Sequence, residues 1–152
     1  MKKICLIASG GGHLEQINQL KGIKEKYDYF IVTQRTKATQ NIKEKNYLIT
    51  ENTRKNNFIF CIKTILIICQ SLVIFLKEKP DVIICTGAGA TIPMCFIGKI
   101  FNKKVIFIES FAKMETPSKT GKIIYLIADV FVIQWEQLKR YYPKAIYGGA
   151  IY

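Results

Sequence analysis

Residues 4–13 read ICLIASGGGH, a run of apolar side chains followed by a serine, three glycines and the only histidine of the chain. Ile4–Ala8 has the length and composition of a short buried strand. Residues 9–12 end this strand, and apolar side chains then recur at helical spacing. A strand, a glycine turn and a helix in this order point backbone N–H groups at an anion. The stretch therefore predicts either a phosphate-binding turn or a tight turn without a ligand.

The rest of the chain alternates between the same two kinds of segment. Strands are predicted over Asp28–Thr33, Asn46–Thr50, Asp81–Cys85, Lys104–Ile108, Asp129–Ile133 and Ala145–Tyr147. Helices are predicted over Leu14–Lys26, Phe58–Leu76, Ala90–Phe101, Gly121–Ile127 and Trp135–Tyr142. Continuous Val/Ile-rich strands separated by helices indicate a parallel sheet covered on both faces. We therefore expect one Rossmann-like, doubly wound α/β domain over residues 1–152.

The charge of the chain suggests an anionic partner. The 152 residues contain 23 Lys and Arg against 11 Asp and Glu, for a net charge of +12. Nucleic acid, an acidic membrane surface and phosphorylated substrates are the candidates, and a merely solvated lysine-rich surface is the alternative. The sequence lacks an arginine-rich block or an aromatic–basic RNA-binding motif, so we expect no nucleic-acid partner.

The cysteines favour a reducing environment. All of them lie in apolar runs without a CxxC pair, and they are Cys5, Cys61, Cys69, Cys85 and Cys95. We therefore expect buried thiols, and neither a metal site nor a disulfide framework. Lys2 and Lys3 precede too few apolar residues for a signal peptide, which predicts a chain that is not secreted.

Two glycine loops are the strongest candidates for a binding site. SGGGH at residues 9–13 and TGAGA at residues 86–90 each follow a strand and open a helix. In a doubly wound sheet the first and fourth strands are neighbours, so the loops should face each other across one crevice. An anion or diphosphate site is predicted there, with a pair of purely structural turns as the alternative. The glycines concerned are Gly10, Gly11, Gly12, Gly87 and Gly89.

Three side chains near these loops could carry chemistry. His13 falls in the first helical turn, where the helix dipole lowers its basicity and suits it to act as a general base or as a neutral donor to phosphate. A capping histidine without chemistry is the alternative. Glu109 and Ser110 directly follow the fifth strand and are expected in the same crevice, unless they only cap a turn. Residues 110–122 read as a loop over the site.

The segment Phe58–Leu76 spans nineteen residues, about 28 Å as a helix, which nearly crosses a bilayer. Lys63, Gln70 and Lys77 recur every seven residues and form a narrow polar stripe. A spanning helix would separate the third strand from the fourth. We therefore expect a helix packed on the sheet, with surplus apolar surface facing a membrane or a partner. A purely internal core helix is the alternative.

SGGGH, TGAGA, ESFAK and VIQWEQLKRYYPKAIYGG occur in this order, and together they resemble the acceptor-side subunit of split glycosyltransferases. Bacterial members are capsule and exopolysaccharide proteins of the PssD/CpsF type. The eukaryotic relative is the membrane-anchoring subunit of the transferase that adds the second N-acetylglucosamine to the dolichol-linked precursor. The family is similar to the N-terminal half of MurG. The resemblance covers essentially the whole chain.

The resemblance implies one half of a GT-B enzyme that requires neither a metal nor another cofactor. This half would bind a lipid-linked diphosphate sugar, while a separate donor-binding glycosyltransferase subunit would hold a UDP-sugar. The product would be a surface polysaccharide precursor on undecaprenyl diphosphate. His13 would be the catalytic base. By position, the five glycines named above match the glycine loops of the family, and Glu109 and Ser110 match its acidic turn, so these seven residues would bind the acceptor diphosphate.

Two surfaces are predicted for attachment. Gln134, Trp135, Leu138 and Tyr142 would dock the donor-binding subunit, because aromatic anchors beside charges are typical of interface centres; a Trp135 buried in the core is the alternative. The apolar helix and the basic surface would hold the protein peripherally on the inner leaflet of the cell membrane, facing the cytoplasm, in place of the N-terminal anchor of the eukaryotic relatives.

Two other functions remain open from the sequence. A self-sufficient nucleotide-binding α/β enzyme could use the same loops, but the second strand ends in Thr33, Gln34 and Arg35 instead of the acidic residue that binds a ribose. A non-catalytic membrane scaffold would use the glycine loops as turns only.

Overall fold

The computed structural model describes residues 1–52 and 57–151; residues 53–56 and 152, which the predicted domain included, lie outside the described part. The described chain forms one parallel sheet in the order β3-β2-β1-β4-β5-β6-β7. Its strands are β1 (Lys3–Ala8), β2 (Asp28–Gln34), β3 (Asn46–Ile49), β4 (Val82–Gly87), β5 (Lys104–Ile108), β6 (Val130–Ile133) and β7 (Ile146–Tyr147). The predicted doubly wound α/β fold is confirmed.

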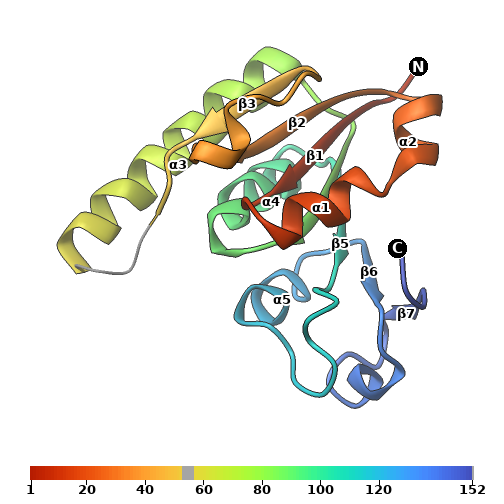
Figure 1. The fold of residues 1–152 in the computed structure, drawn as a ribbon. Helices are drawn as coiled ribbons and strands as arrows, with labels where there is room; N and C mark the ends of the chain where they lie inside the picture. The colour runs from red at the N-terminus through yellow and green to blue at the C-terminus, as the bar shows by residue number, and fades with distance from the viewer. Residues whose placement is uncertain (53–56, 152) are drawn as a thin grey trace.

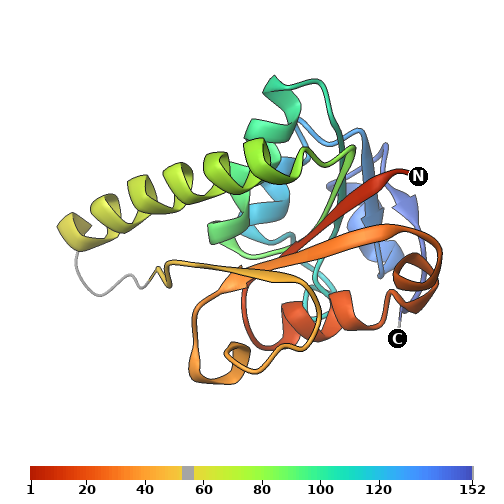
Figure 2. The same cartoon turned by 90° about the horizontal axis from the view of Figure 1, so that it is seen from above.

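Helices cover both faces of the sheet (Figures 1 and 2). They are α1 (Gly12–Asn18), α2 (Lys21–Lys26), α3 (Asn57–Glu78), α4 (Ile92–Ile100) and α5 (Lys119–Ile124), with 3-10 turns η1 (Lys37–Thr39), η2 (Gly89–Thr91) and η3 (Glu136–Arg140). In Figure 2, α1 and α2 lie on one side of the sheet and α3, α4 and α5 on the other. In such folds, ligands bind at the edge of the sheet where the parallel strands end.

Several of the predicted helices differ from the observed ones: Ala90–Phe101 forms η2 and α4, and Trp135–Tyr142 forms only the 3-10 turn η3. The stretch predicted as one helix over Leu14–Lys26 forms α1 and α2, because the backbone of Leu20, with ψ of 50°, leaves the helical region. The predicted helix over Gly121–Ile127 begins earlier as α5, because the Ser118 side chain caps it by accepting a hydrogen bond from the Gly121 N–H at 2.8 Å.

The core has two layers because β1 is buried on both faces. Cys5 and Ile7 pack into the cluster under α3, α4 and α5, whereas Leu6 and Ala8 pack into the cluster under α1. This explains the continuous apolar runs of the strands. The expectation of five buried cysteines is wrong for Cys61 and Cys69, which are exposed; both lie on α3, and much of this helix surface faces outward.

Helix α3 presents an apolar surface to solvent. Its first turns project beyond the sheet in Figures 1 and 2. Its large exposed side chains are Phe58, Ile59, Ile62, Ile65, Leu66, Ile68, Leu72, Val73 and Leu76. The helix is long and apolar enough to cross a membrane by length and composition, and only 22% of its most apolar window is buried. The alternative of a purely internal core helix is therefore wrong.

The polar stripe of α3 faces the protein. Gln70 Oε1 accepts a hydrogen bond from the Thr50 N–H at 2.8 Å, and Asn52 Nδ2 donates to Thr64 Oγ1 at 2.9 Å. Lys77 Nζ lies 5.2 Å from the ring centroid of Tyr47 on β3. A helix on the surface of a soluble domain normally shows the opposite polarity, with its polar face toward water.

Candidate functional site

The two glycine loops lie together at the carboxyl edge of the sheet. Strand β1 pairs directly with β4, so residues that follow the two strands are neighbours. The Ser9 N–H donates to the Gly87 carbonyl at 2.7 Å, and the Ala88 N–H donates to Ser9 Oγ at 3.1 Å. Thr86 Oγ1 donates to the His13 carbonyl at 2.8 Å. The predicted convergence of the loops is confirmed, and it is fixed by hydrogen bonds between them.

The glycines of these loops differ in backbone conformation and in what surrounds them. Gly11 and Gly87 have φ of +72° and +103°, a region that side chains with a Cβ rarely adopt. A Cβ at Gly10 would make only ordinary contacts with threonines of the η1 segment, at 3.6 Å. Nothing in the described chain lies within 4 Å of a Cβ built on Gly11, Gly12 or Gly89. Packing therefore leaves open space on both loops.

His13 stands between the loops at the start of α1. Its side chain is half-buried, and its Nδ1 atom is buried without a hydrogen-bond partner among the described residues. Burial lowers the pKa of His13 from its usual 6.5, although contacts with Thr86 and Gln16 and the negative charge of Glu109 partly oppose this shift. The imidazole is therefore neutral near pH 7, with one ring nitrogen able to accept a proton.

Glu109 lies inside the domain, which corrects its predicted role in holding the acceptor diphosphate. Its exposed fraction is 0%. Oε1 accepts a hydrogen bond from the Ser110 N–H at 2.8 Å, and Oε2 accepts from the Ser118 N–H at 3.2 Å and from the Tyr142 hydroxyl at 3.0 Å. The carboxylate thus fastens the segment that follows β5. Ser110 itself is half-buried at the end of this strand.

The residues predicted to dock a partner make contacts inside the domain. Gln134, Leu138 and Tyr142 are buried, so they form no docking surface, and this prediction is wrong for them. Gln134 Nε2 donates to the backbone carbonyl of Glu109, the residue directly after β5, at 2.9 Å. Trp135 is half-buried, donates from Nε1 to the Phe111 carbonyl at 2.7 Å and packs its ring on that of Phe111. These side chains hold the segment after β5 in place.

Short hydroxyl side chains are the residues of the site that the sequence reasoning missed. Besides Ser9 and Thr86, Thr91 fixes the second loop by donating from Oγ1 to the Ala88 carbonyl at 2.6 Å, and it accepts from the Cys85 thiol at 3.0 Å. The available signal was a serine or threonine directly flanking each glycine run. Within residues 1–52 and 57–151, His, Cys, Asp and Glu side chains form no group of three or more suited to a metal ion.

Comparison with known proteins identifies the family. Over residues 4–151 the chain matches the family described as "Oligosaccharide biosynthesis protein Alg14 like". The chain belongs to this family. It is 41% identical over 81 residues to the "UDP-N-acetylglucosamine transferase subunit ALG14" of Homo sapiens, a match that covers 49% of this chain and 38% of the relative. The subunit of the same name from Saccharomyces cerevisiae is 27% identical over 129 residues, covering 84% and 53%. The chain thus spans about half or less of each relative.

Solved structures share the fold at low sequence identity. MurG of Acinetobacter baumannii superimposes with a TM-score of 0.73 at 14% identity, covering 88% of this chain and 41% of that one. UDP-N-acetylglucosamine 2-epimerase of Rickettsia bellii superimposes with a TM-score of 0.73 at 17% identity, covering 94% of this chain and 41% of that one. The predicted likeness to one Rossmann-like part of a GT-B enzyme is therefore confirmed for the fold.

Proposed function

We propose that this chain is the acceptor-binding subunit of a two-protein glycosyltransferase that works on a polyprenyl-diphosphate-linked sugar. The observation that carries the proposal is the position of His13 between two glycine loops with open space beside them; its imidazole is neutral, and its buried Nδ1 has no hydrogen-bond partner among the described residues. Membership of an oligosaccharide biosynthesis family supports it. The polymer would be a bacterial capsule or exopolysaccharide, as in proteins of the PssD/CpsF type.

The diphosphate of the acceptor would bind at the two loops. Backbone N–H groups in the first turn of a helix have no partner within the helix and carry partial positive charge. Gly12 and Gly89 leave the backbone accessible, because nothing in the described chain fills the space where their side chains would be. A phosphate could approach these N–H groups closely, whereas a larger side chain at either position would block it. Ser110 could add a hydroxyl donor from the end of β5.

His13 would act as the general base. The acceptor hydroxyl attacks the anomeric carbon of the sugar nucleotide, the bond from that carbon to UDP breaks, and the hydroxyl proton moves to the imidazole. A neutral histidine is in the correct protonation state for this transfer at pH 7, because burial lowers its pKa. The donor-binding subunit would hold the departing UDP. The name of the relatives makes UDP-N-acetylglucosamine the first donor to test.

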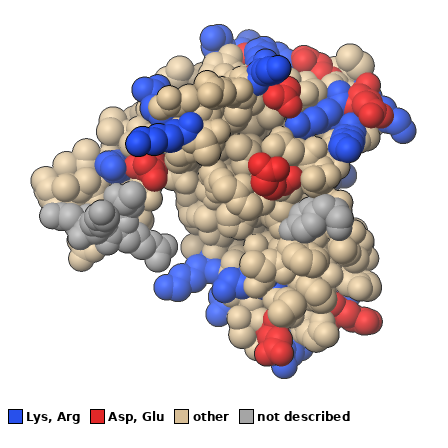
Figure 3. Space-filling view, in the orientation of Figure 1, with Lys and Arg blue, Asp and Glu red and all other residues tan. Residues whose placement is uncertain are grey.

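The apolar face of α3 would attach the protein peripherally to the cytoplasmic side of the cell membrane. Its outward side chains are apolar, whereas its polar stripe contacts β3 and the segment after it. On the face that Figure 3 shows, the Lys and Arg side chains are spread over the surface and do not gather in one patch. A net charge of +12 favours an anionic surface, so attachment should weaken as salt rises.

Vesicle flotation tests this attachment. The protein should float with phosphatidylglycerol vesicles, and less with phosphatidylcholine vesicles or at high salt. Val73→Asp, on the exposed side of α3, should reduce flotation. Gln137→Asp adds the same charge on η3, away from α3, and should leave flotation nearly unchanged. Absence of flotation with either lipid would remove the membrane role.

Reconstitution tests the catalytic proposal. The chain and its cognate donor-binding subunit are purified separately, and sugar transfer from UDP-N-acetylglucosamine to a polyprenyl-diphosphate-linked sugar is measured. Transfer should require both proteins. Titration calorimetry should detect the sugar nucleotide only when the second subunit is present. Rapid transfer by this chain alone, or tight binding of UDP-N-acetylglucosamine to it alone, would instead identify a self-sufficient nucleotide-binding enzyme.

A further inference from the structure

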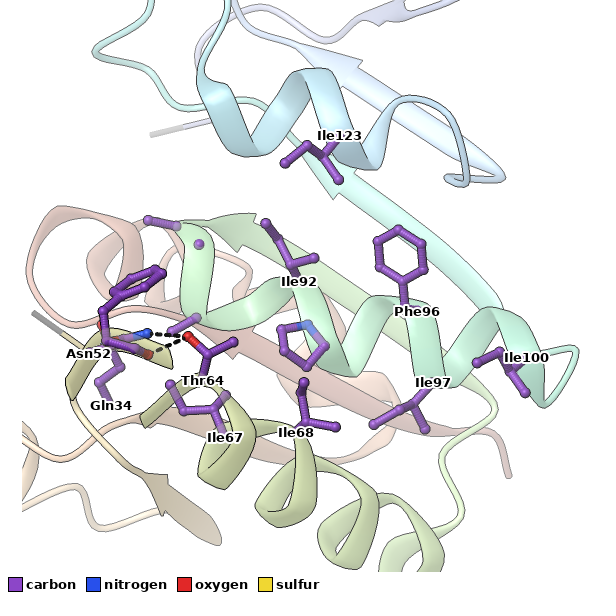
Figure 4. A pocket seen from close by; sticks show the side chains of 15 residues that line it. Gln34, Asn52, Thr64, Ile67, Ile68, Ile92, Phe96, Ile97, Ile100 and Ile123 are labelled. Carbon is purple, nitrogen blue, oxygen red and sulfur yellow. Dashed lines mark hydrogen bonds between the residues drawn. The ribbon is translucent and has the colours of Figure 1, made fainter. Parts of the chain in front are cut away.

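A groove of about 840 Å³ runs between α3 and α4, with Ile123 of α5 on its third side (Figure 4). Its walls are mainly aliphatic and aromatic, and Ile68 of α3 and Phe96 of α4 are among the side chains that face it. Cavities of this size hold small organic ligands, and apolar walls with a few polar groups at one place are typical of them.

The polarity of the groove changes along its length. Gln34, Asn52 and Thr64 lie near one end in Figure 4, while Ile97 and Ile100 lie toward the other. Residues 88–90, the second glycine loop, also line the groove. Because this loop leads directly into the first turn of α4, the groove begins at the proposed diphosphate site. It then follows α4, whose nine residues extend about 13 Å.

We propose that this groove binds the hydrocarbon chain of the polyprenyl-diphosphate acceptor. The inference rests on the proposed function and adds to it a lipid subsite on α3 and α4. An amphiphile with an anionic head and an apolar tail matches the order of polar and apolar groups along the groove. Residues 88–90 would lie beside the first phosphates, and Ile68, Phe96 and Ile97 would contact the chain.

The surroundings of the groove favour a lipid over a polypeptide as its occupant. Several of the side chains that line the groove are themselves exposed on the surface, including Ile68 on α3, Ile100 on α4 and Ile123 on α5. A hydrocarbon chain could pass from a bilayer that covers this side of the molecule into the groove without contacting water. The polar groups of α3 are already used toward β3, so few remain to satisfy the backbone of a bound peptide.

The test compares two soluble probes that share a diphosphate. Titration calorimetry measures the dissociation constants of inorganic diphosphate and of farnesyl diphosphate, which carries a fifteen-carbon chain. Farnesyl diphosphate should bind about tenfold or more tightly, because its chain leaves water. Ile68→Trp, at a position 44% exposed and facing the groove, should abolish this difference. Phe96→Asp, on the opposite wall, should do the same.

Ile65→Trp is the matched control. Ile65 lies on the same helix, is 60% exposed and does not line the groove. This variant should keep the preference for farnesyl diphosphate, so general effects of a bulky residue on α3 are accounted for. Equal affinities of the wild-type protein for the two probes would overturn the proposal and favour a polypeptide as the occupant of the groove. Retention of the preference in both folded groove variants would overturn it as well.

Failure of the lipid subsite can be distinguished from failure of the proposed function. The reconstituted two-protein enzyme is assayed with a long-chain acceptor and with an acceptor in which a methyl group replaces the lipid. Ile68→Trp should slow transfer to the long-chain acceptor, while transfer to the methyl acceptor stays within about twofold of wild type. Loss of transfer to both acceptors in the wild-type enzyme would contradict the proposed function, and the probe titration would still report on the groove.

Discussion

His13 and Gly87 are in direct contact across the two glycine loops. A Cβ added to Gly87 would lie 3.1 Å from Cε1 of the His13 ring and 3.3 Å from its Nδ1. These distances are shorter than ordinary van der Waals contacts. The absence of a side chain at Gly87 therefore determines where the imidazole stands, and the second glycine loop positions the candidate base of the first.

Gly87→Ala should displace the imidazole and strain the backbone. The φ of +103° disfavours any residue with a Cβ, at a cost of about 1–2 kcal/mol. We expect a lower melting temperature by calorimetry and a fall in kcat of the reconstituted enzyme that exceeds the loss of folded protein. Gly22→Ala on α2 is the control, since no atom of the described chain lies within 4 Å of a Cβ built there and its φ is not positive. A Gly87→Ala enzyme with wild-type kcat would show that the position of the ring does not matter.

The pH dependence of transfer should report on His13. A general base must be deprotonated, and burial lowers the pKa of His13 below 6.5, so kcat/KM should be flat near pH 7 and fall in acid below that value. His13→Gln should reduce kcat by about 10²–10⁴-fold and remove this acid limb. If the variant instead loses affinity for inorganic diphosphate with kcat unchanged, the imidazole is a phosphate donor. Wild-type rate and wild-type affinity would contradict both roles.

The pH dependence of protein stability should report on the protonation of His13 independently of activity. The folded protein binds a proton at His13 less readily than the unfolded chain, because the folded-state pKa is the lower one. The free energy of unfolding therefore falls as the pH decreases through 6.5. In urea titrations at pH 7.5 and pH 5.5, His13→Gln should lose less stability on acidification than the wild-type protein.

The sequence predicted the sheet well because the strands of a parallel sheet are apolar on both faces. Ile4–Ala8 differs from the observed β1 by one residue at its start. It also predicted that the loops after β1 and β4 would meet, since chain order limits which strands can be neighbours. Local breaks were less predictable, because Leu20 interrupts the first helix without a proline or glycine at that position.

The site was harder to predict where tertiary contacts decide a role. Glu109 follows a central strand as expected, but its carboxylate turns inward to Tyr142, which lies 33 residues further along the chain. The spacing of Gln70 and Lys77 predicted a polar stripe on α3 and not the direction in which it faces. That direction depends on the position of β3 beside the helix.

Removal of the Tyr142 hydroxyl should loosen the segment after β5. This hydroxyl donates to Glu109 Oε2 at 3.0 Å, and its pKa is raised by burial and by the negative charge of Glu109. Tyr142→Phe should lower the free energy of unfolding by about 1–3 kcal/mol, the usual effect of a hydrogen bond to a charged group. Hydrogen exchange of the amides of Ser110 and Ser118 should become faster. Tyr141→Phe, at an exposed neighbour, should change neither measurement.

Glu78 at the end of α3 should make the fold sensitive to acid. Its buried carboxylate accepts hydrogen bonds from Lys3 Nζ at 2.9 Å, from Lys45 Nζ at 2.8 Å and from the Tyr47 hydroxyl. Burial alone would raise the pKa of Glu78, but the hydrogen bonds from Lys45, Tyr47 and Lys3 outweigh it and lower the pKa from 4.5 to about 2. The carboxylate thereby joins α3 to β1 and β3.

Between pH 4.5 and pH 2 the unfolded chain binds a proton at Glu78 that the folded protein does not. The stability that this carboxylate contributes is therefore complete above pH 4.5 and is lost as the pH falls toward 2. Glu78→Gln should be less stable than wild type at pH 7, because Lys3 and Lys45 lose their charged partner, and the difference should shrink on acidification. Urea titrations at pH 7 and pH 2.5 measure this difference in the free energy of unfolding. Glu25→Gln, at an exposed position, is the control. A difference that stays constant between pH 7 and pH 2.5 would show that Glu78 acts through its shape and not through its charge.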